Sequence, residues 1–140
     1  MRDSAYVIEP QLLFIPYLTR ILERLGIEVI GTSGIVDRQA LLEHRPSLII
    51  VDVDYARRRE LRLIREIRVL VPHASIIAYS VQSDELFVAS CHVAGATCVL
   101  SKSEDEFTLC EQIRLAVAHE DRPEHSVPIE TQTGTEAPLI

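Results

Sequence analysis

The feature that most limits how this chain can fold is the alternation of short apolar runs with longer segments of helical periodicity. The five apolar runs are residues 5–8, 27–30, 48–53, 75–79 and 97–100. The run from Leu48 to Val51 is apolar at every position, which is typical of a parallel strand that helices cover on both faces. Five successive βα units predict an α/β fold, a doubly wound five-stranded parallel sheet with helices on both faces. Its ligand site is expected at the carboxyl edge of the sheet.

The segments between the runs each carry one apolar stripe at helical spacing. Stripes are formed by Leu18, Ile21, Leu22 and Leu25, by Leu63, Ile67, Leu70 and Val71, and by Phe107, Cys110, Ile113 and Val117. The sequence Ser103-Glu104-Asp105-Glu106 has the pattern of a capping box and predicts that the last helix begins there.

The length of 140 residues predicts one folded domain. We expect this domain to span residues 1–120. Residues 121–140 contain three prolines among Ser, Thr and Glu and hold few hydrophobic side chains, so we expect a flexible tail there. A second folded domain has no room, which predicts a stand-alone module.

Charge and hydropathy narrow the classes of partner. The net charge of −7 argues against nucleic acid, which needs a basic surface to displace counterions. The arginines between positions 57 and 68 are expected to form a solvated helix face. The apolar runs are far shorter than the ~20 residues that span a bilayer, and the N-terminus lacks a signal-peptide pattern, so we expect a cytoplasmic protein without membrane contact.

Polar side chains follow the predicted strands at the points where those strands end. They are Glu9, Asp52, Asp54, Ser80 and Lys102. Because parallel strands end at one edge of a sheet, carboxylates, a hydroxyl and an ammonium should meet there in one shallow cleft.

These positions and their flanking motifs resemble the response-regulator receiver family, with a CheY-like (flavodoxin-like) fold, over residues 5–118. Residues 46–52 resemble the third strand of that family, and residues 63–72 its third helix. Residues 75–80 resemble its fourth strand, and residues 95–102 resemble the segment that ends in its lysine. The motifs occur in the family's order.

The resemblance implies a role for each polar residue. Asp52 would accept a phosphoryl group from a sensor histidine kinase or a His-phosphotransfer protein, with Lys102 and Ser80 holding phosphoryl oxygens. Mg²⁺ would be bound by Glu9, Asp52 and the backbone carbonyl of Asp54. The chain would then be a two-component signalling protein rather than an enzyme, acting on a downstream protein target.

The sequence also departs from the family pattern. The family ends its first strand with two acidic residues, whereas this chain has Glu9-Pro10, so Mg²⁺ binding is expected to be weakened. The aromatic switch position of the family is Val99, and its proline after the lysine is Ser103. The acidic pocket is therefore atypical, and an aromatic rotamer switch is not available.

Alternatives remain open at the level of sequence. Asp54 could be the N-cap of a helix starting near Tyr55, and Asp52 could pair with Lys102 only structurally, in a phosphorylation-independent pseudo-receiver. The D-x-D element of residues 52–54 also occurs in haloacid dehalogenase-type phosphatases, although on their first strand. The segment from Leu86 to Val93 is apolar nearly all round, so its solvent face, with the fifth strand, is a candidate surface for a partner or a homodimer.

Overall fold

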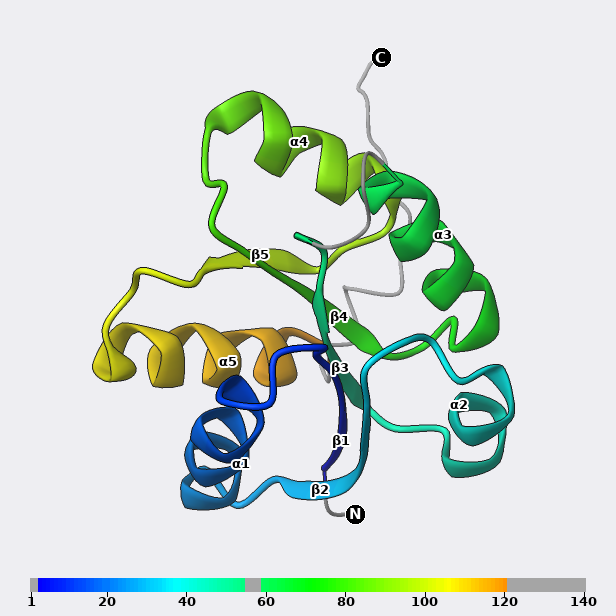
Figure 1. Cartoon of the computed structure of the whole chain (residues 1–140), viewed down its shortest axis with the longest axis vertical. Helices are drawn as coiled ribbons and strands as arrows, with labels where there is room; N and C mark the ends of the chain where they lie inside the picture. Colours follow the sequence, from blue (N-terminus) through cyan, green and yellow to red (C-terminus); the bar gives the residue numbers. More distant parts are fainter. Residues whose placement is uncertain (1–2, 55–58, 121–140) are drawn as a thin grey trace.

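The computed structural model describes residues 3–54 and 59–120 and shows one parallel five-stranded sheet (Figure 1). The strands are β1 (Ser4–Ile8), β2 (Glu28–Ser33), β3 (Leu48–Asp52), β4 (Ser75–Ser80) and β5 (Cys98–Ser101). Their spatial order is β2-β1-β3-β4-β5, and all neighbouring pairs are parallel. The predicted doubly wound sheet is confirmed.

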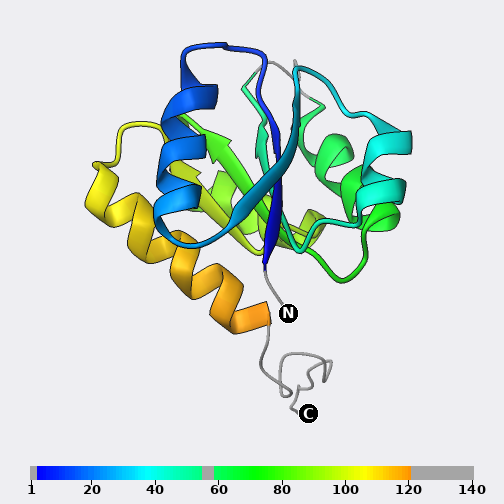
Figure 2. The same ribbon diagram turned by 90° about the horizontal axis from the view of Figure 1, so that it is seen from below.

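Five helices cover the two faces of this sheet. They are α1 (Phe14–Arg24), α2 (Arg38–His44), α3 (Glu60–Leu70), α4 (Glu85–Ala94) and α5 (Glu106–Glu120). Figure 2 shows α1 and α5 on one face, with α2 and α3 on the other. Residues 121–140, predicted to be a tail, lie outside the described residues.

The central strands separate two apolar cores. Ile49 and Val51 of β3 belong to the core under α2, α3 and α4, whereas Leu48 and Ile50 belong to the core under α1 and α5. This alternation follows from the period of two along a strand, and it explains why the run is apolar at every position. All residues of β3 and β4 are buried, including the terminal Asp52 and Ser80. Two polar side chains are therefore buried at the carboxyl edge of the sheet, where β3 and β4 end.

The start of α5 differs from the predicted capping box. The Asp105 carboxylate, not the Ser103 hydroxyl, caps the helix, and it accepts a hydrogen bond from the Thr108 N–H at 2.7 Å. The Ser103 hydroxyl instead lies 2.7 Å from that of Ser101. Of the four residues predicted to face the sheet, Phe107 does not, because its side chain is 74% exposed. Ile113 is buried against the sheet as predicted, together with Leu109 and Ala116, and Cys110 and Val117 are partly buried against the same core.

The interpretation of Asp54 as the cap of the next helix is wrong. The helix α3 begins at Glu60, and the Asp54 side chain is bonded to groups at the edge of the sheet. Residues 55–58, including Tyr55, lie outside the described residues. Ile64 and Ile67 provide the buried stripe of α3, whereas Leu63 is only half-buried, because the helix is rotated slightly from the predicted phase.

The arginine cluster is not uniformly a solvated face. Arg59, Arg62 and Arg65 are exposed as predicted, but Arg68 turns inward. Its guanidinium donates hydrogen bonds to the carbonyl oxygens of Gly95 at 2.7 Å and Ala74 at 2.6 Å. Gly95 ends α4 with a φ of 126°, a conformation that suits glycine. Arg68 therefore joins the ends of α3 and α4 to the start of β4.

The helix α4 presents an apolar face to solvent, as the sequence predicted. Leu86 is 78% exposed and Val93 is 85% exposed, whereas Cys91 and Ala94 pack on the core. None of the helices in the described part of the chain has both the length and the apolar character needed to span a bilayer.

Candidate functional site

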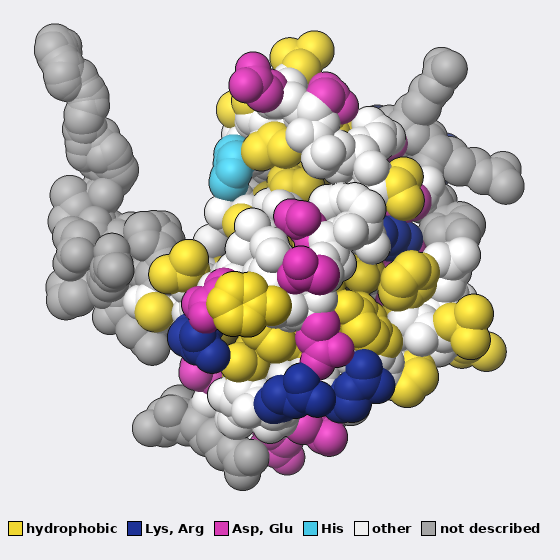
Figure 3. Space-filling view, turned by 90° about the vertical axis from the view of Figure 1, so that its left-hand side faces the viewer, with side chains coloured by type: hydrophobic (Ala, Val, Ile, Leu, Met, Phe, Trp, Pro, Cys, Tyr) yellow, Lys and Arg dark blue, Asp and Glu magenta, His cyan; other side chains and the backbone are white. Residues whose placement is uncertain are grey.

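The five polar residues predicted to converge do lie together at the carboxyl edge of the sheet. Asp52 ends β3 and Ser80 ends β4, while Glu9 follows β1 and Lys102 follows β5. Figure 3 looks onto the side at the left of Figure 1, towards which β4 and β5 run, and shows acidic side chains spread over it among hydrophobic and basic ones. The parallel register places Asp52 opposite Tyr79, and the Lys102 N–H donates to the Ser80 carbonyl. The ends of the central strands are therefore level.

Asp52 is held in one orientation by two donors. The Lys102 ammonium lies 2.8 Å from Oδ2, and the Asp54 backbone N–H donates to Oδ1 at 2.7 Å. Asp52 is only 4% exposed. A carboxylate buried to this degree needs a charged partner, and Lys102 supplies one.

Lys102 connects two carboxylates. Its Nζ lies 2.8 Å from Asp52 Oδ2 and 3.0 Å from Asp54 Oδ2. Burial by itself lowers the pKa of Lys102, but its hydrogen bonds to these two carboxylates outweigh burial, so the pKa lies above its ordinary value. The side chain is therefore a fixed positive charge at neutral pH.

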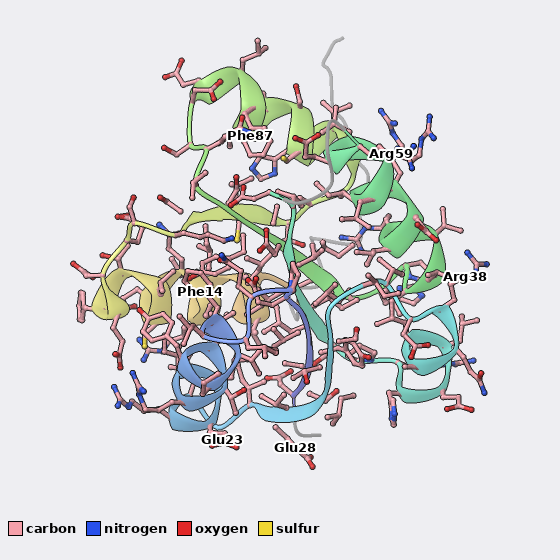
Figure 4. All side chains as sticks on the ribbon, viewed as in Figure 1. Phe14, Glu23, Glu28, Arg38, Arg59 and Phe87 are labelled. Atoms are coloured by element: carbon pink, nitrogen blue, oxygen red, sulfur yellow. The ribbon has the colours of Figure 1, made fainter. Side chains whose placement is uncertain are left out.

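Two aromatic rings flank the Lys102 ammonium, a feature that the sequence reasoning missed. The centroid of the Phe14 ring is 5.0 Å from Nζ, and that of the Tyr79 ring is 5.5 Å away. The rings meet edge to face, with centroids 5.6 Å apart. Figure 4 labels Phe14 where α1 meets the sheet. The electron-rich faces of such rings favour a nearby cation, and the rings restrict where the ammonium can move. The position of Phe14 at the first turn of a helix gave no sequence signal.

The Asp54 carboxylate is bound by groups from β4 and from the segment after β5. The Ser80 hydroxyl donates to Oδ1 at 2.6 Å, and the Val81 backbone N–H donates to Oδ2 at 3.1 Å. Lys102 completes the set. The sequence predicted a role for the Asp54 backbone carbonyl but not this position of its side chain.

Glu9 is buried with one oxygen unpartnered. It is 1% exposed, and its Oε2 accepts a hydrogen bond from the Gln11 backbone N–H at 2.9 Å. Its Oε1 is buried without a hydrogen-bond partner. Burial, and then the neighbouring Asp52 carboxylate, raise the pKa of Glu9 from its ordinary 4.5 to about 8. Without a compensating cation this carboxyl group holds its proton at neutral pH.

The unpartnered Glu9 oxygen bears on whether these residues could bind a divalent ion. Among the described residues, no group of three or more His, Cys, Asp or Glu side chains is arranged to hold a metal ion. Mg²⁺, however, often binds through one or two carboxylates and keeps several waters. Two neighbouring carboxylates, one with an oxygen that lacks any partner, fit an ion of this kind. Pro10 supplies no ligand atom.

A cleft of about 340 Å³ opens beside Asp52. Its walls include Pro10 and Ile35 on one side and Arg59 and Arg62 of the α3 region on the other. Pro10, at the position where the resembling family has its second acid, thus forms an apolar wall of the cleft. Arg59 and Arg62 give this cleft two positive side chains, which the sequence reasoning had assigned only to the solvated surface.

Comparison with known proteins gives a consistent result. The sequence model of the response regulator receiver domain matches residues 5–114. A search of curated proteins finds no match.

Solved structures of receiver-type proteins share the fold. A response regulator from Thermotoga maritima has 22% identity and a TM-score of 0.73, with 84% of this chain and 99% of that chain covered. A Burkholderia pseudomallei response regulator was solved with a phosphorylated aspartic acid, calcium ion and citrate. It has 23% identity and a TM-score of 0.69, and the match covers 89% of this chain and 69% of that chain. The CheX-CheY-BeF3-Mg²⁺ complex from Borrelia burgdorferi has 16% identity and a TM-score of 0.69, and the match covers 83% of this chain and 89% of that chain.

Proposed function

Since the chain belongs to the response regulator receiver domain family of two-component signalling, we propose that Asp52 is its phosphoacceptor. The observation that supports this most directly is the Asp52–Lys102 pair, with 2.8 Å between Oδ2 and Nζ at the carboxyl edge of the sheet. A buried aspartate with a fixed ammonium beside it combines a nucleophile with a positive charge that neutralises transferred phosphoryl oxygens.

The proposed transfer moves one phosphoryl group and no other atoms. A carboxylate oxygen of Asp52 forms a bond to phosphorus while the bond from phosphorus to the donor's leaving atom breaks, and that atom keeps the electron pair. The donor is a phosphohistidine of a sensor histidine kinase or of a His-phosphotransfer protein. The product is an aspartyl phosphate, whose oxygens are held by the Lys102 ammonium and the Ser80 hydroxyl.

The proposed metal site uses the carboxylates of Glu9 and Asp52 and the backbone carbonyl of Asp54. When bound, Mg²⁺ supplies positive charge that neutralises phosphoryl oxygens. In this proposal Glu9 would hold the ion as a carboxylate, which is consistent with the lack of a hydrogen-bond partner at its Oε1. Pro10 leaves the site with one carboxylate fewer than the family pattern, so binding is weak.

The phosphorylated protein signals through protein contacts and is not itself an enzyme in this proposal. The solvent face of α4, with Leu86 and Val93, together with β5 is the surface proposed for a downstream protein or for a homodimer. The acidic net charge of −7 argues against nucleic acid as the target. We place this activity in the cytoplasm, without membrane attachment.

A phosphorylation-independent interaction module is the second candidate. It is favoured by the Ser80 hydroxyl, which is already bonded to Asp54 at 2.6 Å without any phosphoryl group. Val99 also lies where the family has its aromatic switch. The phosphatase alternative loses its support, because residues 52–54 lie at the end of the third strand and not of the first, and the family match covers most of the chain.

Incubation with acetyl phosphate and Mg²⁺, followed by intact mass measurement, tests the phosphoacceptor. The parent protein should gain the mass of one phosphoryl group, and Asp52→Ala should gain none. Asp37→Asn is a matched control, because it removes one carboxylate at the N-cap of α2 and keeps an oxygen for the Ala40 N–H. Phosphorylation of Asp52→Ala, or an unmodified parent, would overturn the proposal.

A further inference from the structure

The Asp54 carboxylate occupies a complete set of anion-binding donors. Its oxygens accept hydrogen bonds from the Ser80 hydroxyl at 2.6 Å and the Val81 backbone N–H at 3.1 Å, and one lies 3.0 Å from the Lys102 ammonium. These donors come from two different strand ends, so the sheet, not the local chain, places them around one point. A hydroxyl, a backbone amide and an ammonium that converge in this way form a site for an anion.

Two of these donors are the groups that the proposed function assigns to the phosphoryl oxygens. Ser80 and Lys102 would have to bind the aspartyl phosphate, and in the structure both already bind Asp54. The hydroxyl of Ser80 has a single hydrogen to donate. It therefore serves either the Asp54 carboxylate or a phosphoryl oxygen.

We infer that the Asp54 carboxylate is an internal competitor for the phosphoryl-oxygen site, and that it leaves Ser80, Val81 and Lys102 when Asp52 is phosphorylated. The inference deepens the proposed function and rests on it for the identity of the displacing group. Whether the Asp54 carboxylate occupies the donors of Ser80, Val81 and Lys102 is a separate question, which inorganic phosphate alone can test.

Charge gives a second reason for competition. Lys102 is the ammonium shared by the Asp52 and Asp54 carboxylates, at 2.8 Å and 3.0 Å. A transferred phosphoryl group brings further negative charge to the same point, which disfavours a carboxylate that remains there. The Asp54 side chain is 16% exposed, whereas that of Asp52 is fully buried, so Asp54 has a path to solvent.

The first experiment measures the rate of Asp52 phosphorylation with acetyl phosphate and Mg²⁺. We expect Asp54→Ala to be phosphorylated about threefold faster or more, the change that corresponds to the loss of one typical hydrogen bond from the competing state. Asp54→Asn keeps an oxygen for Ser80 but loses its charge, so its rate should be intermediate. Asp37→Asn, with the same change of charge at the N-cap of α2, should match the parent.

The second experiment uses inorganic phosphate alone and follows the Val81 backbone amide by NMR. Phosphate should shift this amide in Asp54→Ala at concentrations that leave the parent unchanged. If phosphate binds Asp54→Ala but no protein is phosphorylated, the proposed function and the displacement by an aspartyl phosphate fail, whereas the occupancy of the anion-binding donors by Asp54 stands. If Asp54→Ala gains neither phosphate binding nor rate while the parent is phosphorylated, the competitor is refuted and the proposed function stands.

Discussion

Replacing Arg68 by methionine should strongly destabilise the fold. Its guanidinium bonds to the carbonyls of Gly95 and Ala74 at 2.7 and 2.6 Å, and also to that of Pro72 at 3.0 Å. Methionine keeps the apolar stem of the side chain and removes the guanidinium, with its charge and its hydrogen bonds. Ala74 is buried, so its carbonyl would have no easy replacement by water.

The magnitude follows from the kind of bond that is lost. A hydrogen bond from a charged donor contributes about 1.5–3 kcal/mol, and such contributions do not add fully when they share one side chain. Because Pro72 is exposed, water can replace part of the lost bonding. We therefore expect Arg68→Met to lower the free energy of unfolding by about 2–4 kcal/mol.

Equilibrium unfolding in urea, followed by circular dichroism, measures this loss. Arg65→Met is the matched control, since Arg65 lies on the same helix, is exposed and loses the same charge. Its free energy of unfolding should change by less than about 0.5 kcal/mol. If Arg68→Met were no less stable than Arg65→Met, the view that Arg68 joins α3, α4 and β4 would be wrong.

Two further predictions concern the acidic pocket. In metal-free buffer, the pKa of Glu9 in the folded protein is about 8, above its ordinary value of 4.5. The contribution of Glu9 to the free energy of unfolding is therefore full below pH 4.5 and is lost as the pH rises through about 8. Glu9→Gln has no proton to lose, so its stability relative to the parent, measured by urea unfolding, should rise by about 1–3 kcal/mol between about pH 5 and pH 9. A constant difference would contradict the raised pKa. Pro10→Asp should bind Mg²⁺ several-fold more tightly, by about 1 kcal/mol, because it adds a carboxylate near the ion. Mg²⁺ titrations of both proteins at equal ionic strength check this, and equal or weaker binding by the variant would show that the missing acid does not limit the site.

The sequence by itself determined the sheet and which residues reach its edge. Short apolar runs that alternate with helical segments are typical of buried parallel strands, and the polar residues at the ends of the first, third, fourth and fifth runs are then expected at the carboxyl edge. For this reason the meeting of Glu9, Asp52, Ser80 and Lys102 was predictable without coordinates. The positive φ of Gly26 likewise follows from local backbone sterics at the end of α1.

Only the tertiary structure decided where side chains outside the strands point. The sequence predicted a helix cap at Ser103 and left capping open as one of two interpretations of Asp54, because local sequence shows only that a short polar residue precedes a helix. Asp54 instead meets donors from β4 and beyond β5, and Arg68 meets the carbonyls at the end of α4. Such contacts join residues far apart along the chain, and they compete with local capping on nearly equal terms of about 1 kcal/mol each. Which of them forms depends on how the helices and strand ends are placed in space. The pattern of residues along the sequence does not determine that placement.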